Sequence, residues 1–568
     1  MSYILGISCG YHDSAASLIK DGVVLAACEE ERFTGIKHDY SFPTNTINWI
    51  YKEFNISGDD IDVVTFYDNP ETKLNRIKRS TLRGGLLNYF NRKRIIKRNK
   101  TFSDNIKNEI KKHTHNNVEI FFSEHHLSHA AYSYYTSPYD DALILTVDGV
   151  GEWETTSLYK GKNNQLEKIE SIQFPHSLGM LYSAFTAYLG FRPNEGEYKV
   201  MGLAPYGNPL NYLQNFKKLY TEKQNGDFKL NMKYFTYDYS DTQMFNYKLP
   251  LVFKMPPRTP GSKISQKHKD IASTLQHEYE YLFFKLLKRL SKLGTTKNLC
   301  LGGGCAYNGT ANGKVLRQTS FEKLYIPPAP SDSGSAIGSA LYYYYLVNKD
   351  AKRIANQNPY LGPYYTKEEI QPILQEFEDK IEYKWNIHTS IIDEVTDYIK
   401  DNKVVGWFEG RMEFGARALG NRSILANPRD PDMKRKLNSV VKKREGFRPF
   451  APIVKKESEH KYFIVNGEVP YMNQVVLVRE EHRDDLPAIT HVDGSARIQT
   501  LEKKNHHRMW RILDSLEEKN KYPIVLNTSF NLKDQTMVLD PKTAIQTFLN
   551  CDMDLLVIEN FIIKKKTL

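Results

Sequence analysis

Two histidines four residues apart are the sharpest chemical feature of the sequence. In residues 124–131 (EHHLSHAA), His125 and His129 would project from the same face of a helix, where both imidazoles could bind one metal ion. His126 would lie on another face and need not take part. Two histidines do not complete a metal site, so further ligands must come from elsewhere. A polar helix with packed or solvated histidines is the alternative interpretation.

Two aspartates stand where such ligands could come from. Asp148 lies in a predicted turn after an apolar run, and Asp332 lies at a predicted helix start. Two imidazoles and two carboxylates would form a mixed nitrogen and oxygen site, which suits iron, manganese or zinc rather than calcium.

A glycine triplet and an arginine-dense region could bind phosphates. Gly302, Gly303 and Gly304, followed by Asn308, offer a backbone that a phosphate or ribose can approach closely, although a tight turn after a buried strand is equally consistent. The triplet matches neither a Walker A motif nor a Rossmann fingerprint. In the second half, arginines among glycines and apolar residues suit phosphate or carboxylate oxygens, with structural salt bridges as the alternative. The residues concerned are Arg417, Arg448 and Arg497, with Asn527 and Ser529 after an apolar strand.

The elements that must position these residues follow a repeated pattern. Three strands separated by tight turns open the chain, and the same pattern recurs about 140 residues later. The predicted strands are 4–8, 15–19 and 23–28, then 142–147, 155–159 and a strand starting at 166. Two such copies suggest a duplicated α/β unit, and the actin-like ATPase fold is built in this way.

The rest of the chain predicts further helices, a linker and a second domain. Helices are expected at 265–292 and 333–345, and a linker at 355–363, where two Xaa-Pro pairs occur. Strands at 404–408 and 524–526 would belong to a separate α/β domain. With 568 residues, the chain exceeds the size at which one core keeps growing.

Nearly all of the net charge lies in one window. Residues 73–112 hold fourteen Lys and Arg against two acidic residues, which gives +12, whereas the whole chain carries +11. This window is either a solvated helical insertion or a contact surface for an anionic substrate or partner. Five scattered cysteines, no signal peptide and no membrane-spanning stretch predict a soluble cytoplasmic protein.

With these motifs in order, the sequence resembles the O-carbamoyltransferases that include NodU and TobZ. The resemblance runs nearly end to end, and the basic window is its least typical part. The motifs that carry it are residues 12–16 (HDSAA), 29–33 (EEERF) with Lys37 and His38, 125–131, 199–207 (KVMGLAPYG), 302–306 (GGGCA), 417–423, 491–500 and 527–531 (NTSFN).

This resemblance implies an α/β protein with two domains and two reactions. Residues 1–354 would form a TsaD-like domain with the duplicated actin-like (ASKHA) fold, and residues 355–568 a YrdC-like domain. The YrdC-like domain would make carbamoyl-adenylate from carbamoyl phosphate and ATP. The TsaD-like domain would then pass the carbamoyl group to a hydroxyl of a small-molecule or glycan acceptor, and that acceptor could be anionic.

The resemblance also implies roles for particular residues. His125, His129, Asp148 and Asp332 would bind iron(II) or a similar divalent metal, while magnesium would accompany ATP. His12 would be the general base for the acceptor hydroxyl, with a neutral imidazole near pH 7. The substrate contacts would come from Lys37, Gly179, Gly302, Gly303, Gly304, Asn308, Arg417, Arg448, Arg497, Asn527 and Ser529.

Two other functions fit parts of the pattern. A metal-dependent ATPase or sugar kinase on the actin-like fold would explain the repeated hairpins but not the arginine-dense second half. A tRNA threonylcarbamoylation enzyme would use similar domains, and the basic window could bind RNA. The motif at His12 favours a small-molecule acceptor, so nucleic acid is the less favoured partner. A homodimer is compatible with the sequence.

Overall fold

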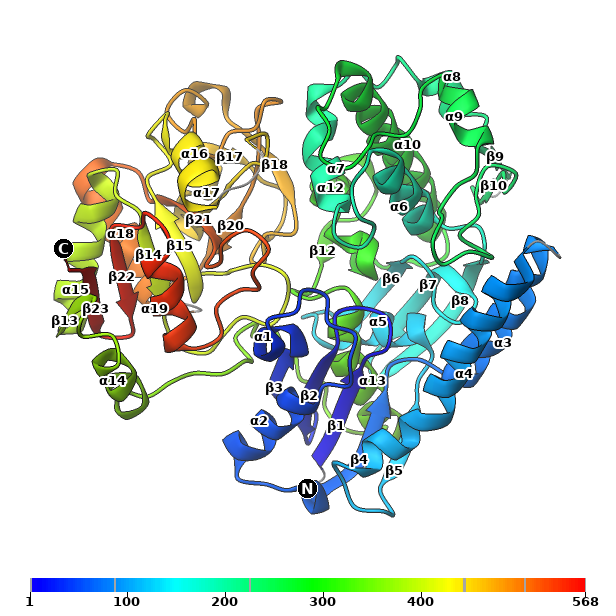
Figure 1. The fold of residues 1–568 in the computed structure, drawn as a ribbon, viewed down its shortest axis with the longest axis horizontal. Coiled ribbons are helices and arrows are strands. Elements are labelled where there is room, and N and C mark those ends of the chain that lie inside the picture. The colour runs from blue at the N-terminus through cyan, green and yellow to red at the C-terminus, as the bar shows by residue number, and fades with distance from the viewer. Residues whose placement is uncertain (1–2, 86–87, 224–225, 443–445, 505–506, 567–568) are drawn as a thin grey trace. The chain divides into compact units, whose positions relative to one another are not determined.

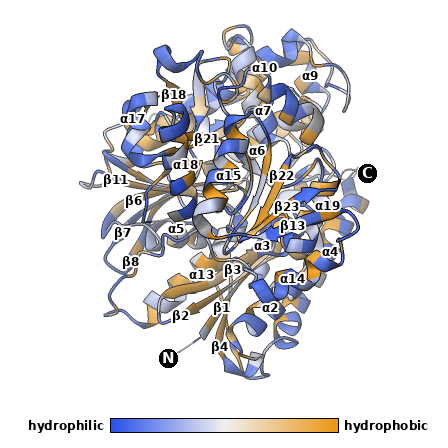
Figure 2. Ribbon diagram, turned by 90° about the vertical axis from the view of Figure 1, so that its left-hand side faces the viewer, coloured by the Kyte–Doolittle hydropathy of each residue, from blue (hydrophilic) through white to orange (hydrophobic). Residues whose placement is uncertain are grey.

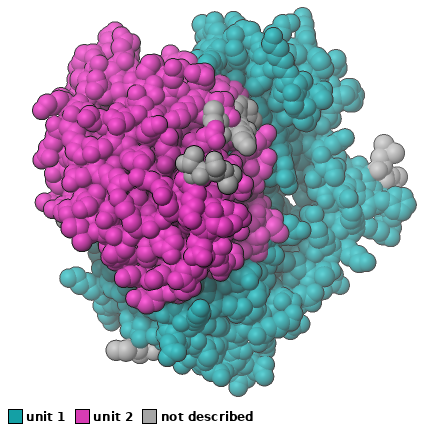
Figure 3. Space-filling model, turned by 60° about the vertical axis from the view of Figure 1, so that its left-hand side comes forward, with its two compact units in different colours: residues 1–30, 38–357 teal, residues 31–37, 358–568 magenta. Residues whose placement is uncertain are grey.

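The computed structural model describes residues 3–85, 88–223, 226–442, 446–504 and 507–566. Two compact units divide the chain (Figure 3). Unit 1 comprises Met1–Glu30 and His38–Gln357, and unit 2 comprises Glu31–Lys37 and Asn358–Leu568. The short segment Glu31–Lys37 therefore belongs with the C-terminal half of the chain, and the division after Gln357 lies inside the predicted linker.

Two five-stranded sheets of the same design form the centre of unit 1 (Figure 1). The first has the order β3-β2-β1-β4-β5 and the second β8-β7-β6-β11-β12, each with three antiparallel strands followed by two parallel ones. The predicted duplication is thus confirmed. The strands are β1 (Tyr3–Ser8), β2 (Ala15–Lys20), β3 (Val23–Glu29), β4 (Ile61–Phe66), β5 (Glu119–Phe122), β6 (Asp141–Val147), β7 (Glu154–Lys162), β8 (Gln165–Gln173), β11 (Asn298–Gly302) and β12 (Lys323–Tyr325).

Helices α5 and α13 pack against each other, and α13 also contacts the first sheet. Gly338 of α13 lies so close to the Ser128 carbonyl of α5 that an added Cβ would stand 1.9 Å from that oxygen.

The α-helices up to the linker are α1 (Glu30–Thr34), α2 (Thr44–Phe54), α3 (Pro70–Ser80), α4 (Tyr89–Lys111), α5 (His125–Tyr135), α6 (Leu178–Tyr188), α7 (Glu197–Leu203), α8 (Leu213–Phe216), α9 (Lys248–Phe253), α10 (Gln266–Leu290), α11 (Gly309–Asn312), α12 (Val315–Gln318) and α13 (Asp332–Val347). Strands β9 (Tyr220–Glu222) and β10 (Phe228–Leu230) form a small ribbon.

An eight-stranded mixed sheet forms the core of unit 2, in the order β13-β23-β22-β14-β15-β21-β16-β20. Its central strands are apolar: β22 reads LLVI, all four residues are buried, and Figure 2 shows it in orange. The strands are β13 (Ile381–Trp385), β14 (Val405–Phe408), β15 (Arg422–Ala426), β16 (Ala451–Lys455), β20 (Gln499–Leu501), β21 (Ile524–Ser529), β22 (Leu555–Ile558) and β23 (Phe561–Lys565).

In the described part of unit 2, a second, three-stranded sheet and further α-helices accompany the large sheet, and most of α1 also belongs to this unit. These strands and helices are β17 (Phe463–Ile464), β18 (Val475–Val478) and β19 (Ser495–Arg497), with α14 (Lys367–Gln375), α15 (His388–Lys400), α16 (Met433–Lys436), α17 (Glu459–Tyr462), α18 (His507–Asn520) and α19 (Pro541–Leu549). The α/β class predicted for both halves is therefore confirmed.

Candidate active site

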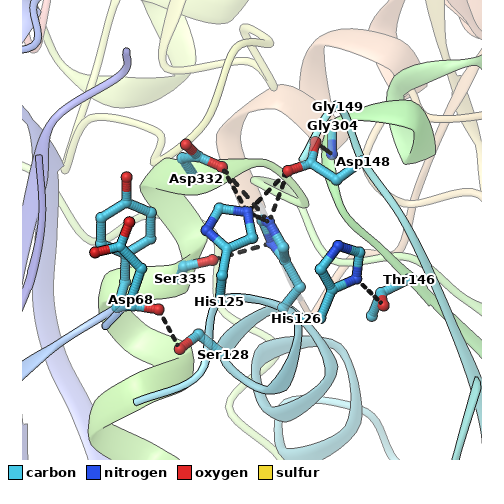
Figure 4. A network of polar contacts seen from close by, with 12 residues as sticks. Asp68, His125, His126, Ser128, Thr146, Asp148, Gly149, Gly304, Asp332 and Ser335 are labelled. Atoms are coloured by element: carbon cyan, nitrogen blue, oxygen red, sulfur yellow. Dashed lines mark hydrogen bonds and ion pairs between the residues drawn. The ribbon is translucent and has the colours of Figure 1, made fainter. Parts of the chain in front are cut away.

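Four elements of unit 1 bring the predicted metal ligands together (Figure 4). Strands β6 and β11 are parallel neighbours, so their carboxyl ends lie at the same edge, with Asp148 after β6 and the glycine triplet after β11. Helices α5 and α13 begin at His125 and Asp332. A carboxylate at a helix start is also favoured by the positive end of the helix dipole.

The donor atoms of the four side chains point at one another. Nε2 of His125 lies 2.8 Å from Asp148 Oδ2 and 3.1 Å from Nε2 of His129. Asp332 Oδ1 lies 3.6 Å from His125 Nε2 and 3.5 Å from His129 Nε2, yet this buried oxygen accepts no hydrogen bond from the residues that the structure describes. All four ligand atoms lie within 4.8 Å of one another. Two imidazoles and two carboxylates converging in this way fit a divalent transition metal such as iron(II).

Neighbouring groups hold these ligands in place. Ser335 Oγ lies 3.0 Å from Nδ1 of His129, so that nitrogen can donate its proton while Nε2 faces the cluster. The Gly304 N–H donates to Asp148 Oδ1 at 3.0 Å, and the His125 N–H donates to the buried carboxylate of Glu152 at 3.1 Å. His126 instead pairs through Nδ1 with Thr146 Oγ1 at 2.7 Å, so it does not join the cluster (Figure 4).

The histidines and aspartates of the cluster stabilise one another's charged forms. Burial by itself would lower the pKa of His129, but the neighbouring carboxylates of Asp148 and Asp332 raise that pKa to about 9. Burial would likewise raise the pKa of Asp148, but His125 and His129 hold it well below its ordinary value. Burial would also raise the pKa of Asp332, but the charges of His12 and His125 lower it. Both aspartates are therefore ionised at neutral pH, the form in which a carboxylate can bind a metal ion.

His12 lies beside this cluster in a hydrogen-bonded group that the sequence pattern did not reveal. Its Nδ1 pairs with Asp13 Oδ2 at 3.0 Å, and its Nε2 lies 3.9 Å from Asp332 Oδ2. Asp13 Oδ1 pairs in turn with Nδ1 of His38 at 2.7 Å. Burial would lower the pKa of His12, but Asp332 and Asp13 raise it well above 6.5. A raised pKa favours the protonated His12 ring, whereas the general-base role assumes a neutral ring. A cation bound at Asp332 would offset the charge of Asp332 and so raise the pKa of His12 less.

The glycines predicted to contact a nucleotide pack closely against the metal-ligand elements. Gly303 has a φ of +86°, and a Cβ there would stand 2.3 Å from the Val147 carbonyl oxygen. A Cβ on Gly179 would stand 2.7 Å from the Asp148 carbonyl oxygen, and one on Gly302 would stand 2.5 Å from Ser133 Oγ. These three positions require glycine for packing alone, so their predicted contact with adenosine stays a prediction.

Asn308 has a structural role as well. Its Oδ1 accepts from the Ala311 N–H at 3.1 Å and so caps α11, and it also accepts from Gln276 Nε2 at 2.9 Å. Its Nδ2 donates back to Gln276 Oε1 at 3.1 Å. Both ends of the amide are therefore engaged within the fold.

In unit 2, the end of β21 carries a polar group with a buried lysine. Lys442 Nζ donates to Asn531 Oδ1 at 2.7 Å and to the Asn531 carbonyl at 2.9 Å, and it also reaches Ser529. Ser529 Oγ donates to Asn531 Oδ1 at 2.7 Å. Asn527 Nδ2 donates to the Ala418 carbonyl at 3.0 Å, while its buried Oδ1 has no hydrogen-bond partner among the described residues. This arrangement offers a cation and polar groups to an anionic ligand.

A buried carboxylate shapes the loop that carries Arg417. Glu413 Oε1 accepts N–H groups of Leu419 at 2.7 Å and Asn421 at 2.7 Å, which fixes the loop around half-buried Arg417. Arg422 is fully buried and donates to the carbonyls of Glu409 and Pro363. These contacts hold the Arg422 guanidinium within the fold of unit 2.

The remaining predicted residues of the second half lie near the same strands. Half-buried Arg448 precedes β16, whose Ala451 pairs with Asn527 of β21. Half-buried Arg497 ends β19, which packs beside β16. Lys37 is exposed and is the last residue of Glu31–Lys37, the short N-terminal segment that belongs to unit 2. Contact of these residues with substrates stays a prediction.

Sequence reasoning missed several residues of the site. Asp13, Glu152 and Ser335 had no assigned role, because nothing in their sequence context marks them as partners of His12, His125 and His129. Lys442 was also missed, although it lies only six residues before Arg448. A lysine inside a run of basic residues looks solvated until the fold shows that it is buried.

Comparison with known proteins identifies the family. Residues 3–341 match the family model for the carbamoyltransferase N-terminus, and residues 396–565 match that for the carbamoyltransferase C-terminus. The chain belongs to the carbamoyltransferase family, as the motifs predicted, and is a transferase enzyme.

Curated relatives match most of the chain. It is 42% identical to protein sll1178 of Synechocystis sp., over 100% of this chain and 97% of the relative. It is 35% identical to the nodulation protein NolNO of Sinorhizobium fredii, over 98% of this chain and 79% of the relative. Nodulation protein U of the same organism is 30% identical over 72% of each chain. Across the residues that the structure describes, no helix is long and apolar enough to cross a membrane.

Proposed function

We propose that this enzyme makes carbamoyl-adenylate in unit 2 and transfers its carbamoyl group to an acceptor hydroxyl in unit 1. In the first reaction, water and carbamoyl phosphate would give carbamate and inorganic phosphate. The carbamate oxygen would then attack the α-phosphorus of ATP, and pyrophosphate would leave. In the second reaction, the acceptor oxygen would attack the carbamoyl carbon, and AMP would leave.

The observation that carries this proposal is the convergence of His125, His129, Asp148 and Asp332 next to His12. These residues would hold a divalent metal, which would supply Lewis acidity toward a phosphate or carbonyl oxygen when bound. A reaction that moves a carbamoyl group to a hydroxyl needs a polarised acyl donor and a proton acceptor, and this group of residues can serve both needs.

Unit 1 residues would handle the acceptor proton. His12 is held by Asp13 at 3.0 Å, which fixes the ring and leaves Nε2 directed toward the metal-ligand side. Once His12 has lost its proton, Nε2 could take the proton of the acceptor hydroxyl, and Asp13 would stabilise the resulting imidazolium.

Unit 2 residues would bind the phosphate groups of the first reaction. Lys442 is buried and presents its ammonium group at Ser529 and Asn531, and the half-buried Arg417, Arg448 and Arg497 lie on loops or strand ends around the same sheet. Their positive charges would offset the charge that shifts when carbamate attacks ATP.

The proposal is tested by incubating the purified full-length enzyme with ATP, with and without carbamoyl phosphate, and measuring pyrophosphate. We expect pyrophosphate release that depends on carbamoyl phosphate. Formation of ADP and a phosphorylated sugar would contradict the proposal and support a kinase instead.

The acceptor is sought by mass spectrometry for a gain of one carbamoyl group. The panel should contain hydroxylated sugars, nucleotide-sugars, glycans and tRNA, supplied with ATP and carbamoyl phosphate. A carbamoylated small molecule or glycan supports the proposal, whereas modification of tRNA alone would favour the threonylcarbamoylation alternative.

A further inference from the structure

Two basic residues of α3, half-buried Lys73 and buried Arg76, differ from the exposed basic residues that follow them. Arg76 is 7% exposed and the side chain of Lys73 is 16% exposed, whereas Lys78 and Arg79 on the same helix are exposed. Lys73 and Arg76 are three residues apart, so they lie on the same face of the helix. The strongly basic window therefore contains an inward-facing pair as well as a solvated surface.

The Arg76 guanidinium has unused hydrogen-bonding capacity. Within the described part of the chain it makes no hydrogen bond and no ion pair, and its buried Nε is without an acceptor; it packs on the Phe174 ring with Cζ 4.9 Å from the ring centre. Within the described residues, neither of the two nearby carboxylates, Asp68 and Glu152, hydrogen-bonds to Arg76. Asp68 pairs with Lys73 Nζ at 2.6 Å, and Glu152 accepts the N–H groups of Asn69 and His125.

A buried guanidinium nitrogen without an acceptor is costly, because its N–H donor has lost water without gaining a partner, and here that nitrogen is Nε of Arg76. Such a group is usually paired with an anion, and no anionic side chain in the described structure hydrogen-bonds to Arg76. An oxyanion from a ligand would satisfy its planar fork of donors.

Lys73 connects this pair to the candidate active site. Its Nζ lies 5.9 Å from the centre of the Tyr11 ring and 5.8 Å from that of Tyr67. The Tyr11 ring lies 4.7 Å from the His12 ring, and the Tyr67 ring lies 5.3 Å from the His125 ring. Asp68, the partner of Lys73, follows Tyr67 directly in the chain and is drawn with the cluster in Figure 4.

We infer that Lys73 and Arg76 form an oxyanion subsite beside the metal-ligand cluster, which binds a phosphate or carboxylate group of the hydroxyl acceptor. The acceptor class is then an acidic hydroxylated molecule, such as a sugar phosphate, a nucleotide-sugar or a uronic acid. This inference rests on the proposed transfer function for the identity of the ligand, but the subsite itself can be tested without it.

The direct test uses crystals of the full-length protein soaked in tungstate, whose tungsten atom is located by anomalous scattering. We expect tungstate within hydrogen-bonding distance of Arg76 in the wild type. Arg76→Gln should lose this peak, whereas Arg79→Gln, an exposed arginine on the same helix, should keep it. Tungstate bound in unit 2 but absent from Arg76 in the wild type would overturn the inference.

Competing soaks identify the oxyanion. Inorganic phosphate that displaces tungstate where malonate does not would assign a phosphate group, and the reverse result would assign a carboxylate. Thermal melting of each variant shows whether it is folded, and Arg76→Lys, which keeps the charge, provides a second variant if Arg76→Gln is unfolded. A folded Arg76→Gln variant that still binds tungstate at this position would contradict the inference.

Kinetics separate this inference from the proposed function. With an acidic acceptor, Arg76→Gln should raise the acceptor KM about 10-fold to 100-fold, since a hydrogen bond to a charged group contributes roughly 1.5–3 kcal/mol. If the enzyme transfers efficiently to a neutral acceptor, and Arg76→Gln has the same acceptor KM as the wild type, the subsite assignment is contradicted. The proposed function is unaffected by that result. Tungstate binding at Arg76 without any carbamoyl transfer would support the subsite and contradict the proposed function.

Discussion

The metal-ligand residues depend on polar neighbours for their orientation. His129 can present Nε2 to the cluster because Ser335 Oγ lies 3.0 Å from its other ring nitrogen. Asp148 is held through Oδ1 by the Gly304 N–H, which leaves Oδ2 facing His125. Such outer partners fix the tautomer and the direction of each ligand.

We therefore predict that Ser335→Ala weakens metal binding without unfolding the protein. The loss should be about 10-fold to 100-fold in affinity, the usual effect of removing an outer hydrogen-bond partner. Metal content after dialysis against graded chelator concentrations, read by elemental analysis, measures it. Ser171→Ala, at a partly exposed serine of β8 in the same unit, is the control. Equal metal affinity in both variants would contradict the assigned role of Ser335.

The second residue-scale prediction concerns acid sensitivity in unit 2. Burial, together with the positive charges of Arg497 and Lys434, outweighs Asp493 and lowers the pKa of His491 to about 4. The ordinary histidine value is about 6.5, so the unfolded chain binds more protons than the folded chain between these values. The free energy of unfolding should thus fall as pH drops from 6.5 to 4.

His491→Gln should reduce this loss of stability by about 1–3 kcal/mol over that range. Urea unfolding of wild type and variant at pH 7 and pH 5 measures the effect. His460→Gln, which replaces a histidine with a 68% exposed side chain, is the matched control. If His491→Gln keeps the full pH dependence of the wild type, another group is responsible.

At the scale of elements, the candidate active site of unit 1 depends on close backbone approach. Helices α5 and α13 can bring their first turns together because Gly338 leaves room for the Ser128 carbonyl. The turn after β11 similarly passes the end of β6, with Gly303 against Val147. The spacing of the ligands is therefore set by packing between elements.

We predict that Gly303→Ala destabilises the protein for two reasons. The left-handed backbone by itself costs about 1–3 kcal/mol for a residue other than glycine. The clash of the added Cβ with the Val147 carbonyl oxygen increases this cost. Gly261→Ala is the control, because Gly261 has a φ of +78° but nothing within 4 Å of an added Cβ. Chemical denaturation compares the two variants. Equal destabilisation would show that close packing at Gly303 has no effect beyond backbone strain.

At the scale of the whole molecule, the two candidate sites belong to different units. The metal-ligand cluster is built entirely within unit 1, and Lys442, Ser529 and Asn531 lie entirely within unit 2. The segment Glu31–Lys37 is an exception to a simple division of the chain, since it comes from the N-terminal half and belongs to unit 2. Within that unit, Arg32 donates to the Gly415 carbonyl at 3.0 Å.

This division predicts that the two half-reactions can be lost separately. His129→Ala should keep pyrophosphate release that depends on carbamoyl phosphate and lose carbamoyl transfer. Arg448→Ala should lose pyrophosphate release, by about 100-fold or more if it stabilises the transferring phosphates. Pyrophosphate and transfer assays on both variants decide the matter. Loss of the same half-reaction in both would show that the assignment of reactions to units is wrong.

Much of the fold could be predicted because it depends on local patterns. Alternating apolar strands with Asp-Gly or Asn-containing turns gave the hairpins of both sheets, and apolar residues at helical spacing gave α10 (Gln266–Leu290) within two residues. The four predicted metal ligands were proposed from local patterns too, two by helical spacing and two by their place at a turn and a helix start, and the structure brings them together.

The sequence alone also showed that nearly all of the net charge lies between residues 73 and 112. It did not show which basic residues of that window are buried and which are exposed. Only the tertiary structure separated Lys73 and Arg76 from the solvated basic residues, and only it joined Asp13 to His12 and Ser335 to His129. The physical reason is that periodicity reports which face of an element is apolar, whereas burial and pairing of charged groups depend on contacts between segments far apart in the chain. Lys442, Asp13 and Arg76 have ordinary sequence surroundings, and the packing of their neighbours decides what each can bind.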